Sequence, residues 1–148
     1  MRKKVIIQVN GKQKYPEGHE DQQELTTEGT FYEQNGIFYV MYKEPGSEST
    51  GHEGVTTFLS MKEGSVVLNR KGAVDLTQKF KKGVLNRSIY ATCHGEIWLS
   101  VMPHCVECDL TVYGGRISLE YSLFIDDNLV SNNLLLLNIK EDLPHESL

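Results

Sequence analysis

One pattern dominates the sequence between residues 28 and 127: a short run of alternating apolar and polar residues is followed by a turn signal, again and again. Alternation with a period of two is typical of a half-buried strand, and glycine or asparagine pairs permit tight hairpin turns. Because short antiparallel strands expose their edges unless the sheet closes, the pattern predicts a small β-barrel. The turn signals are Asn35-Gly36, Glu63-Gly64, Lys71-Gly72, Lys82-Gly83, His94-Gly95, Gly114-Gly115 and Asp126-Asp127-Asn128.

The chain has 148 residues, a length that suits one domain with its own core. We therefore predict an all-β fold over residues 1–148, a single up-and-down antiparallel barrel of about 8–11 strands. Loops are expected at about 10–21 and 44–54, one helical turn over 82–86, and a frayed acidic tail over 141–148. The expected strands are 4–8, 25–33, 37–43, 55–62, 65–71, 74–81, 88–93, 96–102, 107–113, 116–125 and 129–140.

The charge balance argues against a polyanion partner. The net charge is −5 and the basic residues are scattered in pairs, whereas nucleic-acid binding needs a clustered cationic surface. After the positive start, Val5-Ile6-Ile7 is too short for a signal peptide, and no apolar run reaches the length of a membrane span. We therefore expect a cytoplasmic protein without a nucleic-acid or membrane partner, whose three cysteines are free thiols.

Two predicted strands are apolar on both faces: the stretch from Ile37 to Tyr42 and the stretch from Leu134 to Leu137. A barrel with water outside does not require apolar residues on its outer face, so something is expected to cover them. A homodimer interface is one interpretation, since large apolar patches usually mark contact surfaces. Cover by the terminal segments or by the 44–54 loop is the other.

Alternation also places polar side chains on faces that point inward. Gln78 shares its face with Val74, Leu76 and Phe80, and Tyr121 lies among Leu119 and Leu123. An apolar cavity with a few converging polar groups is the usual form of a small-molecule site. We therefore predict a ligand site in the lumen, formed by Tyr42, Glu44, Arg70, Gln78, Tyr90 and Tyr121.

In this hypothesis the protein is a non-enzymatic binder of a small, partly apolar ligand and carries no cofactor. Tyr42 and Tyr121 donate hydroxyl hydrogens, Arg70 faces an anionic group, and Glu44 orients Arg70. The alternative is a filled structural barrel, in which Glu44 and Arg70 satisfy one another and the protein acts as a homodimeric interaction module. A third possibility is an enzyme that uses Glu44 and a tyrosine as acid and base.

Cysteine and histidine residues cluster in Cys93-His94 and in 104–108, which suggests a zinc site at first sight. The two groups are ten residues apart along the meander, roughly 30 Å of strand at about 3.3 Å per residue. Zinc ligands must converge on one point, so we predict no metal site and no catalytic residue, since the hydrolase, zinc-protease and phosphate-loop motifs are also missing from the sequence. The roles of His104, Cys105 and Cys108 stay open.

An ordered set of short motifs resembles a known family. The set is Tyr42-Lys43-Glu44, Arg70-Lys71-Gly72, Gln78-Lys79-Phe80, Tyr90 followed by Gly95-Glu96, and Gly115-Arg116-Ile117-Ser118 with Tyr121. It resembles the YwiB-like family of small cytoplasmic proteins from Gram-positive bacteria over residues 25–125. The resemblance implies a calycin- or lipocalin-like β-barrel with no established activity, and no catalytic residue to transfer. The chain departs from the family pattern at Pro103-His104-Cys105, where the family continues the strand with a threonine.

Overall fold

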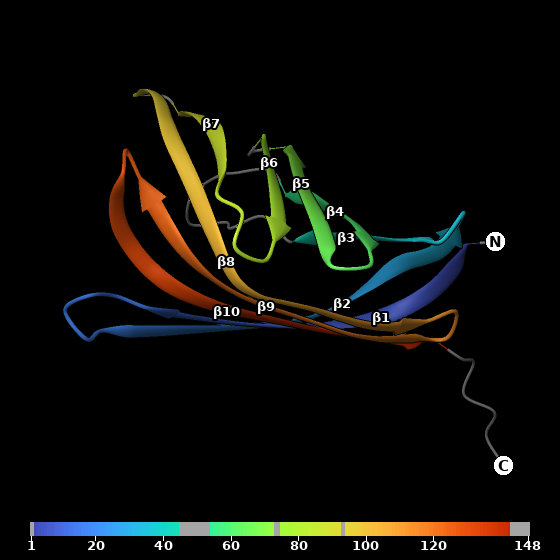
Figure 1. Cartoon of the computed structure of the whole chain (residues 1–148). Helices are drawn as coiled ribbons and strands as arrows, with labels where there is room; N and C mark the ends of the chain where they lie inside the picture. The colour runs from blue at the N-terminus through green and yellow to red at the C-terminus, as the bar shows by residue number, and fades with distance from the viewer. Residues whose placement is uncertain (1, 45–53, 73–74, 93, 143–148) are drawn as a thin grey trace, which may run out of the picture.

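The computed structural model describes residues 2–44, 54–72, 75–92 and 94–142, which form ten antiparallel strands and no helix. The strands join one sheet that curls into a nearly closed barrel (Figure 1). The described residues therefore contain no helix that could cross a membrane. The strands are β1 (Lys3–Lys14), β2 (Glu20–Gln34), β3 (Ile37–Glu44), β4 (Val55–Lys62), β5 (Ser65–Gly72), β6 (Leu76–Lys81), β7 (Asn86–Thr92), β8 (Gly95–Thr111), β9 (Gly114–Ile125) and β10 (Asn128–Glu141).

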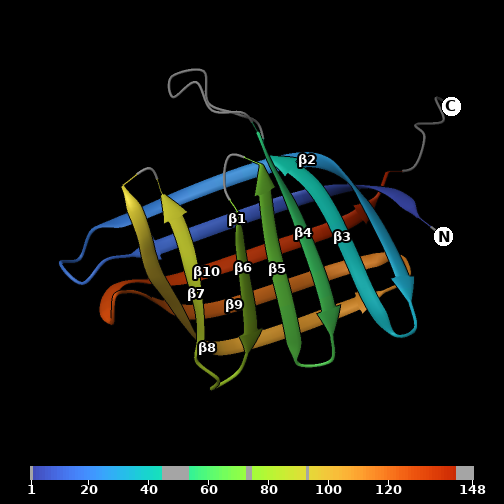
Figure 2. The same ribbon diagram turned by 90° about the horizontal axis from the view of Figure 1, so that it is seen from above.

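The strand order is β6-β5-β4-β3-β2-β1-β10-β9-β8-β7, so the two terminal strands β1 and β10 are neighbours inside the sheet. The long strands β1, β2, β8, β9 and β10 form one layer, and β3 to β6 cross above it (Figures 1 and 2). The predicted up-and-down meander is confirmed, because every strand pairs with its neighbour in sequence except at β6 and β7.

The barrel has a seam between β6 and β7, where side chains replace most of the backbone ladder. Among the described residues of this region, only Lys81 at the end of β6 and Val84 just before β7 form a backbone bridge. Further along, the Lys79 amide donates to Oδ1 of Asn86 at 3.0 Å, and Oγ of Ser88 donates to the Thr77 carbonyl at 2.5 Å. The seam strands are therefore held together by two side chains of β7 rather than by a continuous ladder.

Several predicted turns are confirmed by the backbone. Asn35 and Gly36 have φ angles of 55° and 80°, the left-handed pair of a tight hairpin between β2 and β3. Asp126 and Asp127 adopt the same conformation between β9 and β10, with φ of 47° and 68°. The predicted turn at Gly114-Gly115 is wrong, because both glycines lie within β9 and the turn is formed by Val112 and Tyr113.

The predicted loop at 10–21 is also wrong. The first hairpin is much longer than expected: Lys14 pairs with Glu20, and only the residues between them turn. This hairpin extends beyond the apolar core, so its residues are polar. The alternation of apolar and polar residues therefore does not predict its strands. The predicted frayed tail is wrong at its start, since Glu141 pairs with Val5 and the Asp142 amide donates to the Lys4 carbonyl at 3.0 Å. The rest of the predicted tail, and residues 45–53 of the second predicted loop, lie outside the described residues.

Strand β8 joins two predicted strands, 96–102 and 107–113, into one. The pairing with β9 shifts at His104, between Pro103 and Cys105, which marks a β-bulge. Proline lacks the amide hydrogen that a regular ladder needs, and a bulge accommodates it without ending the strand.

The predicted helical turn at 82–86 is wrong as well: Lys82 and Gly83 form a tight turn and β7 begins at Asn86.

Inward faces follow the predicted alternation. Gln78 and Phe80 of β6, Val101 of β8, and Ile117 and Leu119 of β9 are all buried, while Val74 lies outside the described residues. The core fills one end of the barrel. Its fully buried side chains include Phe31, Phe80, Ile7, Leu59, Met61, Ile117, Leu119, Leu137, Val5, Val40, Val66 and Val101.

The outer apolar face of β3 packs within its own sheet. Tyr39 stacks on Tyr32 with ring centroids 4.7 Å apart, and Met41 pairs with Phe58, which is 38% exposed. This face is therefore partly shielded by its neighbours. The homodimer that was predicted through this strand and through 134–137 stays a prediction.

Candidate functional site

The interior changes from apolar to polar along the barrel, as the strand register shows. Across β3 to β6, the row Phe38, Met61, Val66 and Phe80 is followed by Val40, Leu59, Leu68 and Gln78. The next row is Tyr42, Thr57, Arg70 and Leu76. We call Tyr42, Thr57 and Arg70 the upper polar row.

The opposite layer shows the same change. The row Leu25, Val9, Leu137 and Ile117 of β2, β1, β10 and β9 is followed by Gln23, Gly11, Leu135 and Leu119. The last row is Asp21, Gln13, Asn133 and Tyr121, which we call the lower polar row. Both polar rows therefore lie at the same end of the barrel, beyond the filled core.

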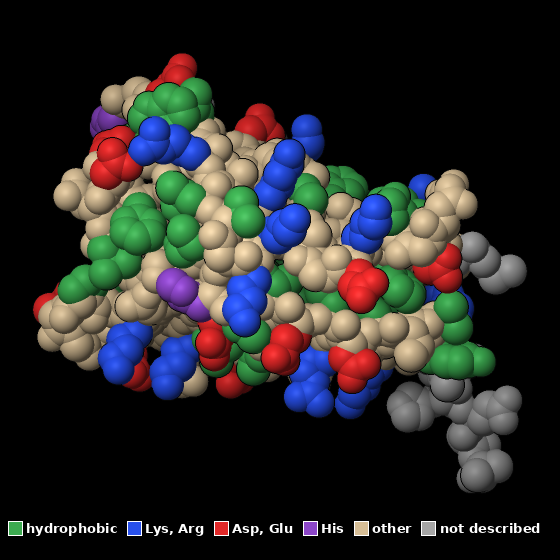
Figure 3. All heavy atoms as spheres, in the orientation of Figure 1, with side chains coloured by type: hydrophobic (Ala, Val, Ile, Leu, Met, Phe, Trp, Pro, Cys, Tyr) green, Lys and Arg blue, Asp and Glu red, His purple; other side chains and the backbone are tan. Residues whose placement is uncertain are grey.

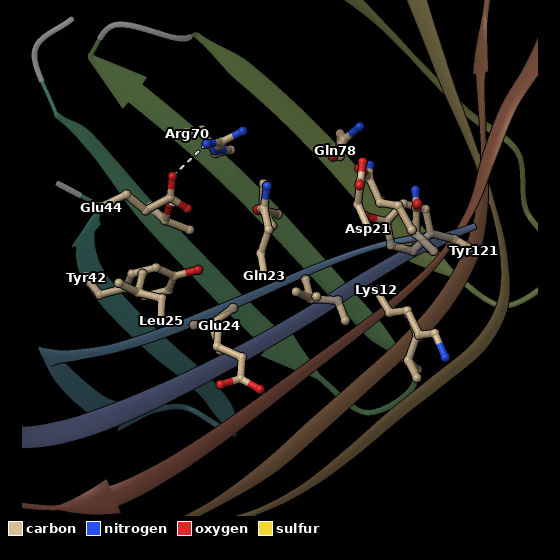
Figure 4. Close-up of a pocket in the computed structure, with 18 residues that line it drawn as sticks. Lys12, Asp21, Gln23, Glu24, Leu25, Tyr42, Glu44, Arg70, Gln78 and Tyr121 are labelled. Atoms are coloured by element: carbon tan, nitrogen blue, oxygen red, sulfur yellow. Dashed lines mark hydrogen bonds and ion pairs between the residues drawn. The ribbon is translucent and has the colours of Figure 1, made fainter. Parts of the chain in front are cut away.

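A cavity of about 620 Å³ lies between these rows and is lined by all seven of their members. It is the size of a typical small-molecule pocket. Five of the six residues predicted for the site line it: Tyr42, Glu44, Arg70, Gln78 and Tyr121. Figure 4 shows Arg70, Gln78 and Gln23 reaching into this space from both layers, with the Tyr42 ring beside Leu25.

Glu44 and Arg70 form an ion pair in the cavity wall. Nη2 of Arg70 donates to Oε2 of Glu44 at 2.6 Å, and Oγ1 of Thr57 donates to Oε1 at 3.3 Å (Figure 4). The side chains are 33% and 29% exposed, so the pair is only partly screened by water. The predicted contact between Glu44 and Arg70 is present, and it fixes the carboxylate against β4 and β5.

Both cavity tyrosines hold their protons more tightly than usual. Burial raises the pKa of Tyr42 to about 12, and Glu44 adds to this, while Thr57 and Arg70 act in the opposite direction. Burial also raises the pKa of Tyr121, against smaller opposing effects of Asn133 and Arg70. The Tyr121 ring meets Phe80 edge to face, with centroids 4.9 Å apart. The two phenols are therefore available as hydrogen-bond donors at neutral pH.

Sequence reasoning missed Asn133, which is 7% exposed and lines the cavity. Oγ of Ser131 donates to its Oδ1 at 3.0 Å, but its Nδ2 makes no hydrogen bond of acceptable geometry in the described part of the chain. Nε of Arg70 is the other buried side-chain donor without a partner there. A signal for Asn133 was available, because it shares its strand face with Leu135 and Leu137.

Tyr90 does not line the lumen cavity, although it was predicted to do so. Tyr90 lies on β7 and pairs with Ile97 of β8, in the part of the sheet that rises away from the layer of long strands (Figure 1). A second hollow of about 440 Å³ follows the seam between β6 and β7, and Arg70 lines both hollows. The wall between the lumen and the seam is therefore formed in part by Arg70.

The histidine and cysteine residues of β8 do not gather. Nε2 of His104 lies 2.7 Å from Oγ of Ser122, which donates to Oδ1 of Asn132 at 2.7 Å, so this histidine secures the bulge. Burial raises the pKa of the Cys108 thiol to about 11. No group of three or more metal-binding side chains occurs in the described ranges, and Cys93 lies outside them.

Acidic and basic side chains alternate over the face of the barrel seen in Figure 3, without a continuous basic stripe. Salt bridges join Lys12 of β1 with Glu20 of β2 at 3.5 Å, and Arg87 of β7 with Asp127 in the turn between β9 and β10 at 2.6 Å. Apolar groups are visible on both sides of this view, and on β7 and β8 the side chains of Ile89 and Trp98 are 49% and 47% exposed.

Comparisons with known proteins agree with the fold. A crystal structure of the ywiB protein from Bacillus subtilis superposes with a TM-score of 0.84, covering 96% of this chain and 94% of that one at 22% identity. The uncharacterised β-barrel protein YwiB of Bacillus subtilis (strain 168) is 30% identical over 112 residues, 75% of each protein. The family model described as a domain of unknown function, DUF1934, matches residues 7–137.

These matches confirm the predicted resemblance to the YwiB-like family and the β-barrel it implies. They attach no activity, ligand or partner to the polar end of the barrel. On the extent of the family match and on the shared strand arrangement, the chain belongs to the DUF1934 family of β-barrel proteins of unknown function.

Proposed function

We propose that this protein is a non-enzymatic, cytoplasmic binder of a small, partly apolar ligand, held in the lumen between the upper and lower polar rows. The observation that carries the proposal is the cavity of about 620 Å³ beyond a fully packed core. A barrel that served only as a structural module would gain stability by filling this space with larger side chains. Here the space stays open between apolar and polar side chains, with Gly11 in its wall.

The lining suits a ligand with an apolar body and a polar handle. Val9, Leu25, Leu68 and Leu135 supply apolar surface, while Gln78, Tyr42 and Tyr121 supply polar groups that fix orientation. Glu44 is already engaged by Arg70 and Thr57, an arrangement that positions Arg70 rather than activating a carboxylate for acid–base chemistry. Binding is therefore the activity that these contacts favour over catalysis.

Gly11 offers a direct test. It lies on the inward face of β1, lines the cavity, and a Cβ atom built on it meets no atom within 4 Å. Gly11→Leu therefore places a side chain in the cavity without a clash, and a larger residue in a strand interior does not weaken the strand. Gly11→Ala is the matched control, because it changes the backbone propensity while leaving most of the volume.

The experiment compares the full-length proteins by native mass spectrometry after gentle purification and by a thermal-shift screen of small organic molecules. We expect a bound small molecule, or a stabilising compound, with the wild type and with Gly11→Ala, and none with Gly11→Leu. Equal responses of wild type and Gly11→Leu would place the ligand outside the lumen. No binding by the wild type in either measurement would contradict the proposal.

The exposed surface supports a second candidate, a homodimeric interaction module. Met41 and Phe58 form an outer cross-strand pair, and Phe58 is 38% exposed. Phe58→Glu should abolish a dimer formed through this face, as measured by sedimentation velocity. A monomeric wild type at micromolar concentration would exclude this candidate.

A further inference from the structure

The hollow of about 440 Å³ along the seam, which we call the seam groove, collects positive charge in an acidic protein. The charged side chains among its described lining residues are four cations and one carboxylate: Arg70, Lys71, Lys79, Arg87 and Asp75. The lumen cavity is different, because three carboxylates and two cations line it. The whole chain carries a net charge of −5. The seam groove is therefore a local reversal of sign, and such a surface attracts negatively charged partners.

Two of the four cations are available to a partner. The two arginines already pair with carboxylates outside the groove, each at 2.6 Å. Lys71 and Lys79 form no salt bridge with any residue that the structure describes. Both lysines are exposed and lie on the outer face of the sheet, because Arg70 and Gln78 beside them face the lumen. An acidic side chain that reaches the seam groove therefore finds two ammonium groups without a described counter-charge.

The seam groove also runs along a free strand edge. β6 and β7 are the two ends of the ten-stranded sheet, and Figure 2 shows them diverging from the turn that joins them. Ser88 donates to the Thr77 carbonyl, and β6 begins only one residue before Thr77, at Leu76. Residues 90–92 of β7 therefore extend past the start of β6 and have no strand opposite them in the described structure. The backbone groups on this side of β7 are a template for a further strand.

Exposed apolar side chains lie beside this edge. Ile89 lines the seam groove, and its cross-strand partner is Trp98 of β8, which is exposed as well. The Arg87 guanidinium lies over the Trp98 ring, 5.5 Å from its centroid. Tryptophan and arginine are enriched among the residues that dominate binding energies. Apolar side chains of a partner therefore have a contact surface next to the two free lysines.

We propose that the seam groove docks an extended, acidic segment of a partner protein, which adds to the edge of β7 as a further strand. The backbone of the segment pairs with β7, its carboxylates contact Lys71 and Lys79, and its apolar side chains contact Ile89 and Trp98. In strand addition the main chain supplies affinity and the side chains supply specificity. A small anion would use the lysines but neither the strand edge nor the apolar pair. The site is separate from the lumen and needs no ligand there.

The test uses acetylated and amidated octapeptides with the full-length protein. EEVVEEVV carries acidic and apolar side chains on both faces of a strand, KKVVKKVV reverses the charge, and EEPVEEPV removes two backbone N–H groups. Trp98 is the one tryptophan of the chain, so its fluorescence reports binding beside the seam groove. We expect EEVVEEVV to bind about tenfold more tightly than either control, with an affinity that falls as salt is raised. Equal binding of EEPVEEPV, or no binding of EEVVEEVV at millimolar concentration, would overturn the proposal.

Two pairs of variants locate the contact. Lys79→Glu should weaken binding of EEVVEEVV about tenfold, whereas Lys62→Glu, the same change at an exposed lysine outside the seam groove, should not. Ile89→Ser should weaken binding several-fold, whereas Leu85→Ser, at an equally exposed apolar residue just before β7, should not. Equal effects within either pair would refute the assigned contact.

Hydrogen exchange decides whether the peptide adds as a strand. Bound EEVVEEVV should slow the exchange of β7 amides and leave the amides of β3, inside the sheet, unchanged. Binding without protection of β7 would mean attraction by charge alone and would refute strand addition.

The remaining outcomes identify other occupants. Citrate that binds as tightly as EEVVEEVV would assign the seam groove to small anions. A dimer in sedimentation velocity that Lys79→Glu abolishes would assign it to a second copy of this chain. Either result would overturn the proposal. Gly11→Leu, which fills the lumen, should bind EEVVEEVV as the wild type does, so a failure of the lumen proposal is distinguishable from a failure of this one.

Discussion

The two ends of the barrel use the same ten strands and the same inward alternation, yet one end is packed solid and the other is hollow. At the filled end, Met61, Val66 and Phe80 belong to the buried core and Phe38 packs against it. Two residues further along the same strands, Gln78 appears, and after two more come Thr57 and Arg70. The difference teaches that alternation decides which side chains face inward, whereas the residue type in each row decides whether the inside is core or cavity.

The largest effect is expected at the filled end. Phe80 is fully buried and supports the Tyr121 ring, so Phe80→Ala should lower the free energy of unfolding by about 3–5 kcal/mol. Urea denaturation of the full chain measures this. Phe58→Ala, at a position 38% exposed on the outer face, is the matched control and should cost less than about 1 kcal/mol. A similar loss in both variants would remove the distinction between packed interior and outer surface.

A smaller effect is expected at the boundary between the two ends, where Tyr42 titrates. Its pKa rises from 10.0 to about 12 on folding, so the folded state keeps a proton that the unfolded state loses. This contribution to stability is complete below pH 10 and is lost as the pH rises through 12, by roughly 3 kcal/mol in all, since one pKa unit corresponds to about 1.4 kcal/mol.

Cys108 acts in the same direction at lower pH, because its pKa rises from 9.0 to about 11. Unfolding curves recorded from pH 8 to pH 11.5 should show a progressive loss of stability that Tyr42→Phe reduces above pH 10 and Cys108→Ala reduces above pH 9. Stability that increases with pH over this range would show that these groups are not shielded from water.

A loss of about 1 kcal/mol is expected at the hollow end, from the ion pair of Glu44 and Arg70, because both side chains are partly exposed. Arg70→Met and Glu44→Gln should each lower the melting temperature, and the double variant should lose less than the sum of the two. Strict additivity would mean that the pair contributes nothing to the fold and that Arg70 is held only for a ligand.

The smallest effect on stability is expected for Gly11→Leu, within about 0.5 kcal/mol of the wild type, because the new side chain enters open space. Gly29→Ala is the contrasting variant on the neighbouring strand. A Cβ at Gly29 would lie 2.4 Å from Cδ1 of Ile7 and 2.5 Å from the Met41 carbonyl oxygen, so this change should be clearly destabilising. Thermal unfolding of both proteins checks the pair, and equal losses would show that the hollow end is in fact tightly packed.

Sequence reasoning predicted the fold well because hairpin chemistry is local. Asn35-Gly36 specifies its turn through two left-handed residues, and alternation assigned Phe80 and Leu119 to the interior. Sequence reasoning failed for strand residues whose inner face does not contact the apolar core. The extension of β1 through Gly11 and Gln13 is polar on both faces because its inner face borders a cavity, so it was interpreted as a loop.

The site was predicted in part, for a related reason. Five inward residues could be assigned from parity along single strands, but Tyr90 could not be placed, because the curvature of β7 and β8 depends on the whole sheet. The burial of Arg70 Nε and Asn133 Nδ2 without a hydrogen-bond partner could not be predicted, because it depends on contacts between strands that are far apart in sequence. Whether a buried donor is satisfied is a property of three-dimensional packing.

The place of the seam has a consequence for how the protein is made on the ribosome. The chain divides into a six-stranded ribbon, β6 to β1, and a three-stranded ribbon, β9 to β7, and β10 joins them by pairing with β1 and β9. Translation delivers β10 after all the others, so both ribbons carry exposed edges until synthesis reaches its fourteen residues. A premature stop before Asn128 would therefore leave the two ribbons without the strand that pairs with both, rather than produce a slightly shortened barrel.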